Sequence, residues 1–188
     1  MARVYMIRHG SPAGAWGGDS ADPGLDERGH GQAEAAAAKL LALAGAPEAV
    51  ASSPLRRCRE TAAPFARALG LEPRIDTSVA EIPTPSALTP LERRAWLQTA
   101  FGGVWADIKG DIDYEAWRQQ VAASVAAAAG TAVFSHFVAI NAAVSVATGD
   151  PRVLCFEPGH ASITVFETDG ARLRLVERGD QAETTITL

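Results

Sequence analysis

The feature that most constrains the fold is an alternation of short apolar runs with longer, alanine-rich segments along the chain. Short apolar runs bounded by turn residues are typical of buried strands, and the longer segments have the length and composition of helices. Glycine and proline separate many of these segments. The predicted strands are residues 2–8, 48–52, 73–79 and 131–135, and the predicted helices are residues 31–43, 54–69, 91–101, 114–129 and 138–148.

The C-terminal part of the chain has a different pattern. Residues 162–167 and 172–176 alternate apolar and polar side chains, and Asp169-Gly170 lies between them, which predicts an antiparallel hairpin. Repeated strand–helix units before it predict a mostly parallel sheet. We therefore expect an α/β fold, a three-layer sandwich with helices on both faces of a mostly parallel sheet and a C-terminal antiparallel hairpin.

The 188 residues fit one domain. We expect a single domain over residues 1–188, with a helical insertion at about 82–118 over one edge of the site. Residues 10–26 are rich in Gly, Ser, Asp and Pro, which predicts a long loop, and long ordered loops are usually functional. Substrate recognition is expected to fall to residues 11–24 of this loop and to the insertion.

The helix at 54–69 has clear signals at both ends. Ser53-Pro54 predicts an N-cap followed by proline at the first helical position, and Gly70 predicts the end. Apolar residues recur inside it at spacings of three and four, which predicts one stripe facing a core. The stripe consists of Leu55, Cys58, Ala62, Phe65 and Leu69.

Composition excludes several classes of protein. The net charge is −5, and the longest basic cluster is Arg56-Arg57-Cys58-Arg59, so nucleic acid is not an expected partner. The two cysteines, Cys58 and Cys155, lie far apart, which argues against a disulfide framework and fits a reducing compartment. The N-terminal apolar run is too short for a signal peptide. We expect a cytoplasmic protein.

One uncharged stretch, residues 119–149, is long enough to span a membrane. Gly130-Thr131 interrupts it, Ser135-His136 adds polar groups, and alanine drives insertion only weakly. We therefore expect a helix, a buried strand and a second helix here, and no membrane association.

Polar residues stand where three predicted strands end. Arg8-His9-Gly10 ends the first strand, Ser52 to Arg57 follow the second, and Ser135-His136 end the strand at 131–135. If these strands are parallel and adjacent, two imidazoles and two arginines meet at one edge of the sheet. Such a cluster of positive groups favours an anion, and the planar guanidinium suits phosphate.

These segments resemble those of the histidine phosphatase superfamily, also called the phosphoglycerate mutase-like family. The similarity extends in order and spacing over nearly the whole chain. It rests on Arg8-His9-Gly10, on Leu25-Asp26-Glu27-Arg28-Gly29-His30-Gly31-Gln32-Ala33, on Ser53-Pro54-Leu55-Arg56-Arg57-Cys58-Arg59-Glu60-Thr61-Ala62, on Ser135-His136 and on Gly159-His160-Ala161-Ser162-Ile163-Thr164.

The resemblance implies a role for each of five residues. His9 would be the nucleophile that carries a phosphohistidine intermediate, and Arg8, Arg57 and His136 would bind the phosphoryl oxygens. Glu81 would be the proton donor to the leaving oxygen. Glu92 and Asp76 are the alternatives to Glu81, which could also be a solvated loop charge.

Other charged or titratable residues near these motifs are expected to do less. Arg56 and Arg59 compete with Arg57, but only the family motif selects Arg57, and the other two are expected at the surface. His30 is expected to be exposed or capping, and Cys58 to be core. His160, in a turn before a strand, could reach the cleft.

The sequence also departs from the family pattern. Ser11-Pro12 follows the triplet, and the loop lacks the family's asparagine; Asn141, on a predicted helix, is the only asparagine in the chain. Phe137 stands where the family commonly has glycine after the second histidine. It could narrow the cleft or, as we hypothesise, offer an apolar wall to the substrate.

The expected function is hydrolysis of a small phosphomonoester through a phosphohistidine, without metal or other cofactor. The alternatives are phosphoglycerate mutase-type phosphoryl transfer and a non-catalytic phosphate-binding module of the same fold. The sequence contains no P-loop, and neither cysteine has an arginine six residues later, so two other phosphate chemistries are not expected. Asp107, Asp111 and Asp113 lack the spacing of a calcium loop. Nothing in the sequence indicates the oligomeric state.

Overall fold

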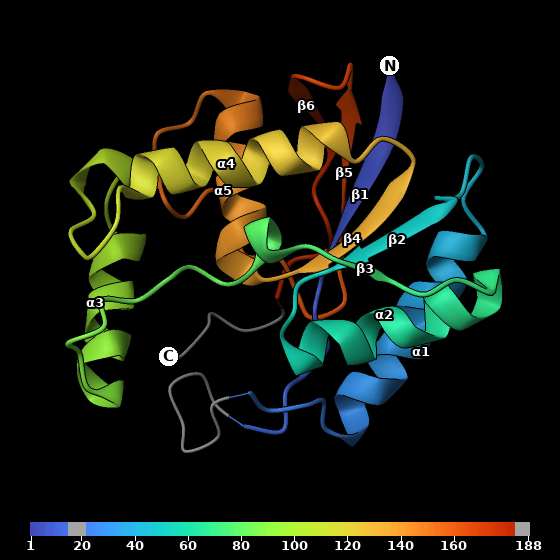
Figure 1. Cartoon of the computed structure of the whole chain (residues 1–188), viewed down its shortest axis with the longest axis horizontal. Coiled ribbons are helices and arrows are strands. Elements are labelled where there is room, and N and C mark those ends of the chain that lie inside the picture. Colours follow the sequence, from blue (N-terminus) through green and yellow to red (C-terminus); the bar gives the residue numbers. More distant parts are fainter. Residues whose placement is uncertain (15–21, 183–188) are drawn as a thin grey trace.

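The computed structural model describes residues 1–14 and 22–182 (Figure 1). Residues 15–21 of the predicted 10–26 loop therefore lie outside the described part. The strands are β1 (Ala2–Arg8), β2 (Ala49–Ser52), β3 (Arg74–Ile75), β4 (Thr131–Ser135), β5 (Ile163–Thr168) and β6 (Leu173–Glu177). The α-helices are α1 (Glu27–Leu41), α2 (Arg56–Leu69), α3 (Pro90–Phe101), α4 (Tyr114–Ala127) and α5 (Phe137–Thr148), and two short 3₁₀ turns are η1 (Thr77–Val79) and η2 (Trp105–Asp107).

The strands form one six-stranded sheet in the order β3-β2-β4-β1-β5-β6. β4 lies between β1 and β2 and is parallel to both, with Arg8 opposite Ser135 and Ser52 opposite Phe134. β5 and β6 are antiparallel and extend the sheet beyond β1 as a hairpin. The carboxyl ends of β1, β4 and β2 therefore meet at one edge, and the predicted fold class is confirmed.

Helices cover both faces of this sheet (Figure 1). Tyr5 and Ile7 of β1 belong to the core cluster with α1 and α2. Val4 and Met6, which point to the opposite face, belong to the cluster with α4 and α5. Burial on both faces explains why β1 reads as a continuous apolar run rather than an alternating one.

Several predicted boundaries differ from the structure. α1 begins at Glu27 rather than Gly31, because the Asp26 side chain accepts a hydrogen bond from the Gly29 N–H (2.6 Å) and caps the helix. α2 begins at Arg56, with Leu55 at the N-cap position, so the predicted Ser53 cap is wrong. The strand predicted at 73–79 is only Arg74–Ile75, because Asp76 caps the turn η1 directly after it.

The stretch at 119–149 forms the end of α4, the buried strand β4 and α5, as predicted. In the described part of the chain, no helix combines the length and the apolar character that crossing a bilayer requires. Residues 82–118 hold α3, η2 and the beginning of α4, and α3 lies away from the sheet, beyond α5 (Figure 1). That this segment is an insertion within a single domain stays a prediction.

Candidate active site

The backbone of residues 8–10 is held at the sheet edge by three neighbouring elements. The His9 N–H donates to the carbonyl of Ser135 (3.0 Å), and the Ala161 N–H donates to the carbonyl of Arg8 (3.1 Å). The Gly10 N–H donates to the Thr61 hydroxyl of α2 (3.0 Å), which itself donates to the Arg57 carbonyl (2.7 Å). Because these bonds come from β4, from α2 and from the turn before β5, the position of His9 is fixed by the whole sheet edge.

The hydrogen bonding of the His9 ring defines its tautomer. Its Nδ1 lies 2.8 Å from the carbonyl oxygen of Gly10, which can only accept, so Nδ1 carries the proton. Nε2 is then left with a free lone pair. Burial lowers the pKa of His9 well below its usual value, and the charges of Arg57 and Arg8 lower it further. The ring is therefore neutral at neutral pH, as a nitrogen nucleophile must be.

Arg8 is a buried cation beside His9. One terminal nitrogen, Nη1, donates to the carbonyl of Pro158 (2.8 Å), and the guanidinium carbon lies 5.1 Å from the centre of the Phe137 ring. Desolvation lowers the pKa of Arg8 to about 10, against the opposing effect of Glu81. Arg8 still carries its charge at neutral pH, so the sheet edge presents a fixed positive group.

His136, at the end of β4, is fully buried and bonded through both ring nitrogens. Its Nδ1 lies 3.0 Å from Nη2 of Arg57, and its Nε2 lies 2.8 Å from the Ser53 hydroxyl. An arginine N–H can only donate, so Nδ1 accepts and Nε2 carries the proton. The rings of His9 and His136 are 5.4 Å apart, edge to face.

Glu81 follows η1 and enters the same cluster. Its Oε2 lies 3.7 Å from Nδ1 of His136, Oε1 accepts a hydrogen bond from the Ile82 N–H (3.0 Å), and its side chain is 14% exposed. Burial raises the pKa of this carboxyl group, although Arg57 and Arg8 oppose the shift. Because its pKa is raised, the carboxyl group stays protonated at pH values closer to neutral, which suits a proton donor.

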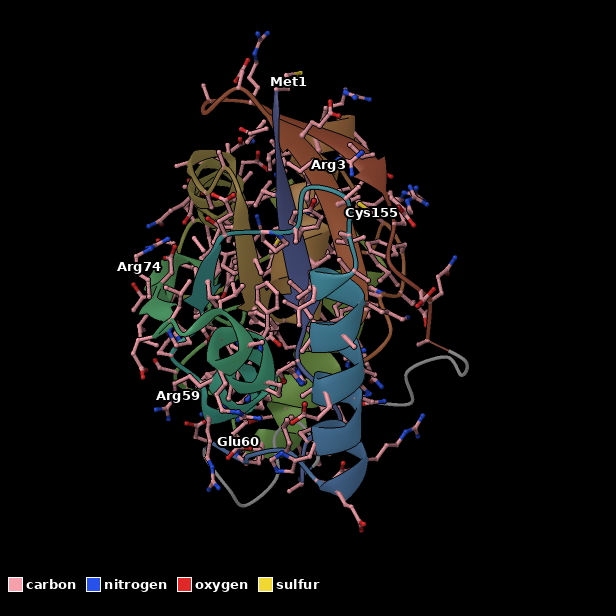
Figure 2. The ribbon with its side chains drawn as sticks, turned by 90° about the vertical axis from the view of Figure 1, so that its right-hand side faces the viewer. Met1, Arg3, Arg59, Glu60, Arg74 and Cys155 are labelled. Carbon is pink, nitrogen blue, oxygen red and sulfur yellow. The ribbon has the colours of Figure 1, made fainter. Side chains whose placement is uncertain are left out.

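The competing residues lie elsewhere. Glu92 caps α3 in a capping box with Thr89, and Asp76 accepts hydrogen bonds from Ser78 and Ser124. Arg56 and Arg59 are exposed whereas Arg57 is buried, and Figure 2 shows Arg59 at the surface of α2. The structure thus brings together all five predicted residues, Arg8, His9, Arg57, Glu81 and His136.

Sequence reasoning missed two contributors to the cluster, Ser53 and Thr61, and left open whether His160 reaches it. Ser53, predicted as a helix cap, contacts His136 instead. Thr61 links α2 to Gly10. The ring of His160 lies 5.7 Å from that of His9, and burial together with Arg8 lowers the pKa of His160 to about 4. The polar residue in the Thr-Ala segment of α2 was the available signal for Thr61. The expectation that His160 could reach the cleft agrees with its position beside His9.

Cys58 lies in the core, as predicted, and also touches the site. It is fully buried, and its Sγ lies 3.3 Å from both the Ser135 carbonyl oxygen and Nε2 of His136. Burial raises the pKa of the thiol. The Cys58 thiol is therefore uncharged at neutral pH and packs against the His136 ring. His30 is exposed on α1, in keeping with its predicted lesser role.

The departures from the family pattern also have structural explanations. The Ser11 hydroxyl donates to Asp26 (2.7 Å), and its N–H donates to the Gln32 side chain (2.8 Å), so the loop is tied to the start of α1. The Asn141 side chain accepts hydrogen bonds from the N–H groups of Cys155 and Phe156 and donates to the Phe137 carbonyl (3.0 Å), so its polar atoms are used within the protein. Phe137 is only 6% exposed, which leaves little surface for a substrate wall.

Within residues 1–14 and 22–182, no group of three or more histidine, cysteine, aspartate or glutamate side chains is arranged so that it could hold a metal ion. The positive charge at the sheet edge comes from Arg8 and Arg57.

Comparison with solved structures identifies proteins of the same fold. A mycobacterial glucosyl-3-phosphoglycerate phosphatase is 24% identical with a TM-score of 0.73, and the match covers 97% of this chain and 100% of that one. Phosphoserine phosphatase of Entamoeba histolytica is 19% identical (TM-score 0.75; coverage 96% and 98%). A putative alpha-ribazole-5'-P phosphatase of Escherichia coli is 18% identical (TM-score 0.74; coverage 98% and 99%).

A search of the curated proteins found no match. The family comparison, in contrast, matches nearly the whole chain, over residues 4–181. With the sheet order and the motif residues described above, it places the protein: the chain belongs to the histidine phosphatase superfamily, branch 1.

Proposed function

We propose that the protein is a phosphatase that hydrolyses a small phosphomonoester through a phosphohistidine on His9. The observation that carries this proposal is the hydrogen bond from Nδ1 of His9 to the Gly10 carbonyl (2.8 Å), which leaves Nε2 free as a nucleophile among buried positive groups. The names of the three similar structures, all phosphatases, support the same reaction class.

In the first step, Nε2 of His9 attacks phosphorus, and the bond from phosphorus to the ester oxygen breaks. Arg8 and Arg57 bind the phosphoryl oxygens and stabilise their charge, and His136 lies beside them. The protonated Glu81 carboxyl transfers its proton to the leaving oxygen, so that an alcohol rather than an alkoxide departs. The raised pKa of Glu81 favours the protonated starting state.

In the second step, water attacks the phosphorus of the phosphohistidine, and the bond to Nε2 breaks. Glu81, now a carboxylate, takes one proton from the water, which regenerates both His9 and the acid. Inorganic phosphate then leaves. If a phosphorylated sugar acid took the phosphoryl group in place of water, the same residues would perform the mutase reaction.

Metal independence is part of the proposal. Two guanidinium groups already supply fixed positive charge where the phosphoryl oxygens would lie, and arginine forms paired hydrogen bonds to phosphate. The residues that would recognise the alcohol part of the substrate belong to the 11–24 loop and the 82–118 segment, which we propose as the specificity elements.

The test is hydrolysis of para-nitrophenyl phosphate by the purified protein in the presence of EDTA. We expect turnover that EDTA leaves unchanged and that His9→Ala abolishes. His30→Ala is the matched control, because His30 is exposed on α1, and it should keep full activity. Full activity of His9→Ala would overturn the nucleophile assignment, and loss of activity in EDTA would overturn metal independence.

A further inference from the structure

Arg8 has an unusual set of partners for a buried cation. Within the described residues, the Pro158 carbonyl accepts from Nη1 (2.8 Å), and buried Nε has no hydrogen-bond partner. The Phe137 ring lies under the guanidinium, with its centre 5.1 Å from Cζ. A cation over an aromatic face is attracted by the negative charge of that face, most strongly where water is excluded.

The Phe137 ring also contacts a residue of α3. Phe137 is the first residue of α5, directly after His136, and its ring centre lies 5.5 Å from that of Phe101, the last residue of α3. The ring is 6% exposed, so its surface is used against protein rather than toward the open side of the site. The two phenylalanine rings are tilted by 44° to each other, so a series of side-chain contacts runs from Phe101 of α3 through Phe137 to Arg8 at the phosphate-binding edge.

We propose that Phe137 is a positioning residue for Arg8: its ring, which also contacts Phe101, holds the guanidinium where it binds the phosphoryl oxygens. This inference rests on the proposed function, in which Arg8 contacts the phosphoryl group. It replaces the hypothesis that Phe137 is an apolar wall for the substrate.

The physical advantage lies in the donors that the ring leaves free. A carboxylate partner would take up the N–H groups of Arg8 and offset the charge that must attract phosphate. An aromatic ring stabilises the charge through its electron-rich face and takes up no N–H group in the way that a carboxylate oxygen does. Arg8 therefore stays charged, fixed in position and able to donate to an anion.

These contacts also connect α3 to the phosphate-binding edge. Phe101 lies in the 82–118 segment, far from Arg8 in sequence, yet only one ring separates the two side chains. A change at Phe101 is therefore expected to alter phosphate affinity in the same direction as a change at Phe137, but by less.

The decisive experiment varies the charge on the ring face while it nearly preserves the shape of the ring. Phenylalanine 137 is replaced by mono-, di- and trifluorophenylalanine, and calorimetry measures the dissociation constant of inorganic phosphate. We expect this constant to rise stepwise with fluorination, to about tenfold for the trifluoro ring. Values of kcat/KM for aryl and alkyl phosphates should fall by one common factor.

Two outcomes would overturn the inference. A phosphate dissociation constant that does not change across the fluorinated series means that the ring face does not hold Arg8. A loss of kcat/KM confined to esters with apolar alcohols means that Phe137 is a substrate wall. If the unmodified protein neither binds phosphate nor hydrolyses any ester, the proposed function itself fails, and the inference with it.

Two variants in α3 provide the matched comparison. Phe101→Leu removes the ring that contacts Phe137 and should raise the phosphate dissociation constant about two- to fivefold. Trp96→Leu, in the same helix, removes a ring that packs on Tyr114 at 5.5 Å and should leave it unchanged. Equal effects of the two variants would mean that α3 contributes only to general stability, and would contradict the role of Phe101.

Discussion

Arg57 and His136 are bonded to each other, with 3.0 Å between Nη2 of the arginine and Nδ1 of the imidazole. The arginine must donate, so the histidine is neutral and its proton lies on Nε2, which donates to Ser53 (2.8 Å). Burial and the nearby Arg57 lower the pKa of His136 well below its usual value, which agrees with this assignment. The orientation of His136 thus depends on the Ser53 hydroxyl.

Removal of that hydroxyl by Ser53→Ala should lower kcat/KM for an aryl phosphate about 5- to 150-fold, because the buried Nε2–H of His136 loses its oxygen acceptor at a cost of about 1–3 kcal/mol. The pH profile of kcat/KM should change as well, since Ser53 determines which ring nitrogen of His136 carries the proton. Ser145→Ala is the matched control: that hydroxyl is also buried, but it bonds Arg118. An unchanged rate and pH profile in Ser53→Ala would contradict the account.

Glu81→Gln should have an effect that depends on the leaving group. The amide cannot donate a proton as an acid does, so alkyl phosphates should lose about 10²–10⁴-fold in kcat. Para-nitrophenyl phosphate, whose leaving group needs little protonation, should lose much less. Glu92→Gln is the control, because Glu92 is exposed on α3 and glutamine also fits the capping box there. Equal losses for both kinds of ester would contradict the assignment of Glu81 as proton donor.

The fold and the central cluster were predictable because their determinants are local. The apolar run before Arg8 and that before His136 each mark a strand, and because β1 and β4 pair in parallel, the two histidines that follow them lie together at one edge. The end of β4 at Ser135 was predicted to the residue. β3 was too short for any periodicity to define, and the Asp76 side chain ended it by capping η1.

The remaining site residues depend on tertiary contacts that no local pattern carries. Ser53-Pro54 has the sequence of a helix start, yet the hydroxyl bonds His136, which lies 83 residues later. His160 approaches His9 only because the turn before β5 is hydrogen-bonded to β1. From the sequence, Phe137 is expected to face a substrate. Its contact with Phe101 could not be foreseen, because the two residues lie far apart in the sequence.

Gly10→Ala should destabilise the protein by about 1–3 kcal/mol, because the added methyl group would lie 2.6 Å from the Gly29 carbonyl oxygen. The Gly29 carbonyl belongs to the backbone, and the added methyl group is attached directly to the Gly10 backbone, so neither can move aside like the end of a flexible side chain. Gly31→Ala is the opposite case: nothing lies within 4 Å, and alanine in α1 should stabilise by about 0.5–1 kcal/mol. Urea unfolding measures both, and equal stability of Gly10→Ala and the parent would show that the close approach relaxes without cost.

The histidines predict how stability changes with pH. The pKa values of His9 and His136 are lowered in the folded state, and that of His160 is lowered to about 4. The unfolded chain therefore binds protons that the folded chain excludes, so the free energy of unfolding should fall as pH falls below about 6.5. The raised pKa of Glu81 acts in the opposite sense above its ordinary value.

His160→Ala isolates one part of this effect. Between about pH 6.5 and 4, the free energy of unfolding should fall less steeply with falling pH in the variant than in the parent. The two slopes should differ by less than about 1.4 kcal/mol per pH unit, because partial exposure screens the imidazole. Urea unfolding at several pH values gives both curves. Parallel curves would show that His160 titrates alike in the folded and unfolded chains.

The proposed mechanism requires that His9 receives the phosphoryl group, and trapping the phosphoenzyme shows whether it does. The protein is quenched during turnover of a radiolabelled phosphomonoester, and the labelled peptide is identified by mass spectrometry. We expect one acid-labile, alkali-stable phosphoryl group on His9 that is absent from His9→Ala. A phosphoryl group on another residue, or turnover with no phosphoenzyme at any quench time, would contradict it.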